Sequence, residues 1–102
     1  MRHKEKTLET NIREETRMQD GIIYTYTLLM SESKSFSSYR IPLYSIKVEM
    51  IQSDGTVTQS ESNKIFADLG IATDFFEKMV KNLATPIDLP YVIEDEFYKH
   101  TI

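Results

Sequence analysis

Apolar and polar positions alternate along much of the first two thirds of the chain, and this alternation predicts β-strands. Residues 22–30 are dominated by β-branched, aromatic and aliphatic side chains, and residues 44–50 place an apolar side chain at every second position. A period of two with one apolar side is typical of an antiparallel strand buried on one face. We therefore expect strands over 22–30 and 39–53, a shorter one over 12–18 that could equally begin a helix, and a polar edge strand over 56–62.

Two Asp-Gly pairs mark turns between these strands. Asp20-Gly21 and Asp54-Gly55 each follow a candidate strand. A two-residue hairpin loop needs positive φ at its central residues, a conformation that Asp-Gly supplies readily. The serine-rich residues 31–38 predict a loop. The strands should therefore form an antiparallel meander.

Two helices are predicted after the strands. Asp74 and Glu77 have the spacing of a capping box, and the apolar residues that follow recur at helical intervals until Pro86 ends the pattern. Asp88 is expected to cap a second helix, with Pro90 in its first turn.

These elements predict an α+β fold, in which an antiparallel meander of three to four strands is followed by two C-terminal helices packed on one face. The chain has 102 residues, enough for one small core, so residues 12–102 should form a single domain. After Met1, residues 2–11 contain one apolar side chain, Leu8. So little apolar surface cannot offset the entropy cost of ordering, and a flexible tail over 1–11 is expected.

Composition narrows the compartment and the chemistry. There is no cysteine, which excludes disulfides and thiolate sites and agrees with a reducing compartment. No apolar run approaches the roughly 20 residues that span a bilayer, and no signal peptide is predicted at the start. We expect a cytoplasmic protein that engages no membrane.

The charge distribution does not favour nucleic acid. The net charge is −4, and acidic residues outnumber lysines two to one from residue 71 onward. Nucleic-acid binders gather Lys and Arg, because neutralising phosphates supplies much of their affinity. We therefore expect no nucleic-acid partner.

Candidate catalytic and cofactor residues are few. His3 and His100 lie close to the chain ends, where nothing is expected to hold a general base in place. Glu96 and His100 could share a helix face, but two ligands make a weak metal site. The three glycines form no phosphate loop. We therefore expect no enzyme, no cofactor and no metal.

Three segments carry a resemblance to a known family. They are residues 24–28, residues 44–49 and residues 86–97, the last with the pattern Leu-x-x-Val-x-Glu-Asp-x-Phe. Over about residues 12–98 the chain resembles a family of small uncharacterised proteins from clostridia and related Gram-positive bacteria, known as a domain of unknown function. The resemblance implies a bacterial cytoplasmic protein and transfers no catalytic residue.

The predicted sheet has more apolar positions than two short helices can cover. If alternate residues of 22–30 face the helices, Ile23 and Leu29 face away, and Leu43 and Ile51 lie on the same uncovered side. A contiguous apolar patch on a small protein marks an interface. We expect an interface there unless the N-terminal segment covers this side.

The acidic run Glu94, Asp95 and Glu96 is a second candidate contact, for a basic partner, although it could equally serve only as a solubilising surface. Together these features predict a non-catalytic protein-interaction or regulatory module that binds a protein partner or self-associates. The alternative is a small-molecule-binding module with a pocket between sheet and helices.

Overall fold

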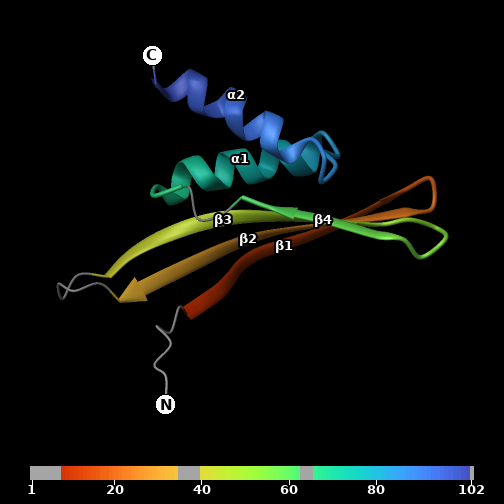
Figure 1. Ribbon diagram of the computed structural model, residues 1–102, viewed down its shortest axis with the longest axis horizontal. Coiled ribbons are helices and arrows are strands. Elements are labelled where there is room, and N and C mark those ends of the chain that lie inside the picture. The colour runs from red at the N-terminus through yellow and green to blue at the C-terminus, as the bar shows by residue number, and fades with distance from the viewer. Residues whose placement is uncertain (1–7, 35–39, 63–65, 102) are drawn as a thin grey trace.

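The computed structural model describes residues 8–34, 40–62 and 66–101. In this part of the chain one sheet forms a layer and both helices lie on one side of it (Figure 1). The elements are β1 (Leu8–Gln19), β2 (Ile22–Lys34), β3 (Arg40–Ile51), β4 (Val57–Glu61), α1 (Leu69–Lys81) and α2 (Leu89–Thr101). The strands lie in the order β1-β2-β3-β4 and each neighbouring pair is antiparallel. The predicted α+β meander with two C-terminal helices is confirmed.

Strand β1 begins earlier than the sequence pattern indicated. Leu8 pairs with Glu32 of β2, so the expected tail over 1–11 is wrong for residues 8–11, and residues 1–7 lie outside the described part. Backbone pairing orders this polar stretch, and backbone groups are the same whatever the side chain. The helix alternative for residues 12–18 is also wrong, because these residues continue β1.

The two Asp-Gly turns differ in form. Asp20 and Gly21 have φ of 55° and 78°, which confirms the two-residue hairpin loop between β1 and β2. At the second turn, the Gln52 N–H donates to Thr56 O and the Gly55 N–H donates to Gln52 O, both at 2.9 Å. Gly55 has φ of 92°, so this is a three-residue loop that ends on a left-handed glycine.

The core lies between the helices and the sheet face below them. Both Phe75 and Phe76 of α1 are buried there, and the Phe75 ring lies 5.2 Å from that of Phe66. The buried hydrophobic cluster consists of Tyr26, Leu28, Tyr44, Ile46, Val48, Phe66, Ala72, Phe75, Phe76, Met79, Val80, Ala84 and Leu89.

Helix α1 starts one and a half turns before the predicted cap. The N-cap is Asp68, whose Oδ1 accepts a hydrogen bond from the Ile71 N–H at 3.0 Å. The predicted cap, Asp74, is wrong because the apolar stripe already begins at the fully buried Ala72. Gly70 lies in the first turn of the helix.

A left-handed residue ends α1. The Leu83 N–H donates to Val80 O at 3.2 Å and the Ala84 N–H donates to Met79 O at 3.1 Å. These two bonds form a Schellman motif, in which the residue just past the helix is left-handed and is usually glycine. Here it is Leu83, with φ of 51°, so the chain turns before Pro86 is reached.

The start of α2 uses the predicted aspartate in a different role. The Thr85 N–H donates to Asp88 Oδ2 at 3.0 Å, and the Asp88 N–H donates to Thr85 Oγ1 at 3.3 Å. This reciprocal pair has the hydrogen-bond pattern of a capping box and closes the turn just before α2, which begins at Leu89. Pro90 lies in the first turn of α2, as predicted.

Tyr26 joins the sheet to the helical connection. Its ring is fully buried, and its hydroxyl donates to the carbonyl of Ala84, between α1 and α2, at 2.9 Å. Burial raises the pKa of the Tyr26 hydroxyl from 10.0 to about 12. The folded protein therefore favours the protonated tyrosine more than the unfolded chain does.

We expect the stability that Tyr26 contributes to be complete below pH 10 and to be lost as the pH rises to about 12. Near pH 12 this loss should lower the free energy of unfolding by about 2 kcal/mol. Tyr26→Phe should cost about 1–2 kcal/mol at neutral pH, because the Ala84 carbonyl loses its donor, and should remove this part of the alkaline loss. Urea unfolding across this pH range measures both effects.

The matched control is Tyr91→Phe, because Tyr91 is 70% exposed. It should change neither the stability at neutral pH nor its alkaline slope. Parallel alkaline slopes for the wild type and Tyr26→Phe would contradict the assignment.

Candidate interaction surface

One face of the sheet carries neither of the two described helices, and we call it the outer face. Tyr26 and Leu28 of β2 belong to the core, so Thr27 between them and Leu29 after them point to the outer face, as the alternation predicted. On β3, Tyr44, Ile46 and Val48 belong to the core. The odd-numbered residues of β3 therefore point to the outer face. Figure 1 shows both helices on the opposite side of the sheet.

An apolar row crosses the outer face near the two hairpin loops. Met18 of β1 pairs with Ile23 of β2, Ile23 pairs with Ile51 of β3, and Ile51 pairs with Val57 of β4. Met18 is 71% exposed and Val57 is 55% exposed, while Ile23 and Ile51 are half-buried. Four strands at a spacing of about 4.8 Å give a row about 14 Å long. We call these four side chains the apolar row.

The middle of the outer face presents little apolar surface. Leu29 is only 8% exposed, so of the four expected interface residues it is a poor contact. Leu43 is half-buried and pairs with Ser31, well away from the apolar row. The structure therefore brings Ile23 and Ile51 together as cross-strand neighbours and separates Leu29 and Leu43 from them.

Two buried hydroxyls also lie in this middle region. Ser31 is 2% exposed and Ser45 is fully buried, and within the described residues the Oγ atoms of both lack a hydrogen-bond partner. The expected alternative, cover by the N-terminal segment, concerns residues 1–7 outside the described part and residues 8–11, which belong to the sheet itself.

Acidic side chains flank the apolar row along the outer face. Glu49 lies two residues before Ile51 on β3, and Lys47 pairs with Glu61 of β4. On β1, Glu14 pairs with Thr27 and Glu9 pairs with Ser31. The described outer face thus carries four carboxylates and one ammonium group.

The C-terminal acidic run lies elsewhere. Glu94 and Asp95 are exposed on α2, on the helical side of the sheet (Figure 1). The side chains of Glu96 and His100 lie outside the described part, as does His3. The structure therefore does not join the acidic run to the apolar row.

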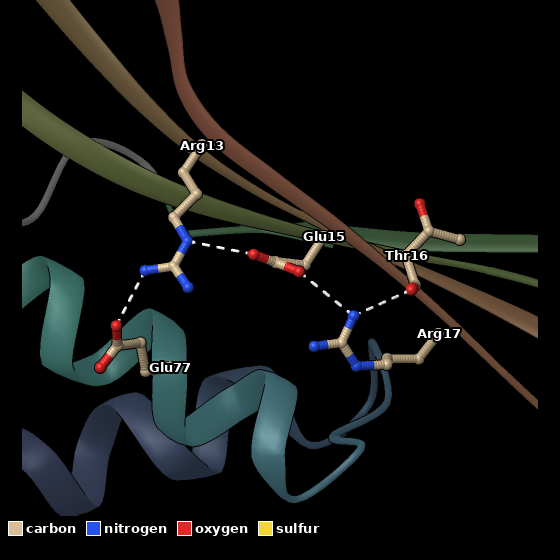
Figure 2. Close-up of polar contacts among 5 residues, drawn as sticks. All are labelled: Arg13, Glu15, Thr16, Arg17 and Glu77. Atoms are coloured by element: carbon tan, nitrogen blue, oxygen red, sulfur yellow. Dashed lines mark hydrogen bonds and ion pairs between the residues drawn. The ribbon is translucent and has the colours of Figure 1, made fainter.

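A polar cluster ties the edge strand β1 to α1, as Figure 2 shows. Arg13 Nη1 donates to Glu77 Oε2 of α1 at 2.8 Å, and Arg13 Nε donates to Glu15 Oε2 at 3.2 Å. Arg17 Nη1 donates to Glu15 Oε1 at 3.2 Å and to the Thr16 carbonyl at 3.0 Å.

The electrostatics of this cluster follow from its hydrogen bonds. Arg13 and Arg17 hold the pKa of the Glu15 carboxyl below its ordinary value, and Glu77 and Glu15 raise the pKa of Arg13. The Arg13 guanidinium also lies 5.3 Å from the centre of the Phe76 ring, a cation–π distance. Arg13 thus contacts both an acid and an aromatic ring of α1.

Sequence reasoning missed Met18, Val57 and the Arg13–Glu77 contact, for different reasons. The two-residue loop fixes Met18 opposite Ile23, so counting outward from Asp20-Gly21 could have found it. By contrast, Arg13 and Glu77 lie 64 residues apart, and no local pattern indicates that they meet.

Within residues 8–34, 40–62 and 66–101, no group of three or more His, Asp or Glu side chains is placed to hold a metal ion. In that same part of the chain, neither helix combines the length and the apolar character needed to cross a membrane.

The fold and this surface define a small two-layer α+β domain whose sheet is covered by helices on one face. The model of the family of unknown function DUF6514 matches residues 5–98, and the chain belongs to this family. No curated protein and no solved structure shows significant similarity to the chain.

Arg13→Met should lower the free energy of unfolding, because the contacts with Glu77, Glu15 and Phe76 are lost while the aliphatic stem remains. The difference from the wild type should shrink as salt is added. It should also shrink as the pH falls below 4.5, because Glu15 then loses the charge that Arg13 stabilises. Urea unfolding at two salt concentrations and across this acidic range measures both trends.

Arg17→Met is the matched control for the loss of an arginine from β1 without loss of a contact to α1. The hydrogen bonds of Arg17 described above go to Glu15 and Thr16 of its own strand. Glu77→Gln combined with Arg13→Met should cost less than the sum of the two single changes. Additive costs would show that the ion pair to α1 contributes nothing.

Proposed function

We propose that this protein is a bacterial cytoplasmic, non-catalytic interaction module that binds a protein partner through the outer face of its sheet. The observation that carries the proposal is the apolar row, which crosses all four strands on the face without helices. Exposed Met18 and Val57 extend the row to both edge strands. A continuous apolar stripe that remains exposed on a small domain is the usual anchor of an interface.

The charge of the same face supports a protein over nucleic acid. Three carboxylates, those of Glu14, Glu49 and Glu61, lie on the outer face beside or near the row, with Lys47 among them. Phosphate backbones are repelled by such a surface. A protein can instead bury its own apolar side chains on the row and meet the carboxylates at the rim.

The row also offers variants that should leave the fold intact. Met18 and Val57 are the two most exposed members, so replacing them removes little core packing. We expect Met18→Ser combined with Val57→Ser to keep the wild-type unfolding free energy within about 0.5 kcal/mol and to abolish partner binding.

The test compares three baits in a pull-down from the native cell: the wild type, the Met18→Ser/Val57→Ser variant, and Ile87→Ser. Ile87 is 70% exposed and lies before α2, so it controls for loss of an exposed apolar side chain elsewhere. We expect at least one protein that the wild type and Ile87→Ser retain and the row variant loses. That protein should then bind the purified wild type at a defined stoichiometry.

The proposal is wrong if every retained protein is captured equally by the row variant. It is also wrong if Ile87→Ser and the row variant lose the same proteins, because the row would then have no special role.

A further inference from the structure

The outer face also indicates the chemistry of its occupant. Resting on the proposed function, we infer that the occupant of the apolar row is a basic amphipathic protein segment and not a second copy of this chain. The apolar row supplies the contact area, and the negative charge of the carboxylates beside it favours a positively charged occupant.

The charged side chains belong to β1, β3 and β4, and they lie on the side of the row that faces away from the hairpin loops. Glu49 is the next residue on the outer face of β3 before Ile51, and the residue paired with it on β4 is the neutral Gln59. One further position along, Lys47 stands between Glu61 on β4 and Thr27 on β2, with Glu14 beyond on β1. Glu14 and Glu61 are exposed, so their charges reach the solvent that a partner must displace.

A second copy fits this face poorly. Two outer faces packed row on row, with the strands of both copies extending to the same side of the row, would place both sets of carboxylates together, with one Lys47 from each copy to offset them. Like charges brought together across an interface are repulsive, and the repulsion acts against wrong partners. The apolar row alone is only about 14 Å long, which is little area against the roughly 800 Å² per partner of a standard interface.

A basic amphipathic segment fits both features. Its apolar side chains can cover Met18, Ile23, Ile51 and Val57, and its Lys or Arg side chains can reach the carboxylates one and two positions along the strands. A helix of about three turns is about 16 Å long, close to the length of the row. Apolar anchors with charges at the rim are the arrangement found at helix-in-groove interfaces.

The test is a selection from a displayed library of random peptides of about four helical turns, carried out on the full-length wild type. Peptides that also bind the Met18→Ser/Val57→Ser variant are removed. We expect the remaining peptides to be rich in Lys and Arg and to carry apolar residues at helical spacing. Glu14→Gln combined with Glu61→Gln should weaken their binding about fivefold at low salt and less at high salt.

The matched charge control is Glu94→Gln combined with Asp95→Asn, two exposed carboxylates on the helical side. This variant should bind the selected peptides as the wild type does. Sedimentation of the wild type at high micromolar concentration should show a monomer.

The outcomes separate the two proposals. Row-dependent peptides that are neutral or acidic, an equal loss with the α2 control, or a dimer that Met18→Ser/Val57→Ser dissociates would overturn the inference and leave the row as an interface. Failure to select any row-dependent peptide, together with no row-dependent protein in the pull-down, would overturn both.

Discussion

Two helices lie on one face of the four-stranded sheet, and this arrangement determines how both faces are used. Each helix has 13 residues. Helix α1 covers the central positions of β2 and β3, and α2 adds Leu89 to the same core. Tyr26 bonds to the Ala84 carbonyl and so fixes the turn between the helices above β2. Among the described residues no helix remains for the outer face, where Met18 and Val57 stay exposed to solvent.

The same arrangement leaves the sheet edges to be protected by other means. Among the described strands β1 is an edge of the sheet, and Arg13 ties this edge to α1 through Glu77. Charged side chains on an edge strand also discourage unwanted pairing. At the other edge, Tyr44 exchanges backbone bonds with Phe66. The backbone nitrogen of Pro42, two residues earlier, points to the same side of β3 as that of Tyr44, away from β2. The N–H that proline lacks therefore costs no hydrogen bond to β2.

One face is therefore closed by the protein itself, and the other carries a narrow apolar row rather than a broad patch. Leu29, Ser31 and Ser45 are buried in the middle of the outer face, and they separate the apolar row near the hairpin loops from the half-buried Leu43. A small apolar row with carboxylates along one side suits recognition of a short segment more than the formation of a large, permanent interface.

Local patterns in the amino acids were enough to predict the strands, the hairpin at Asp20-Gly21 and the amphipathic stripe of α1, because these depend on periodicity and on turn residues. It also identified Ile23 and Ile51 as outward-facing. The three-dimensional arrangement was needed to show that Leu8 begins a strand, that Val57 lies beside Ile51, that Leu29 is buried and that Arg13 meets Glu77. Each of these depends on which segments lie side by side, and pairing between backbones or between residues far apart in the chain leaves no local pattern in the amino acids.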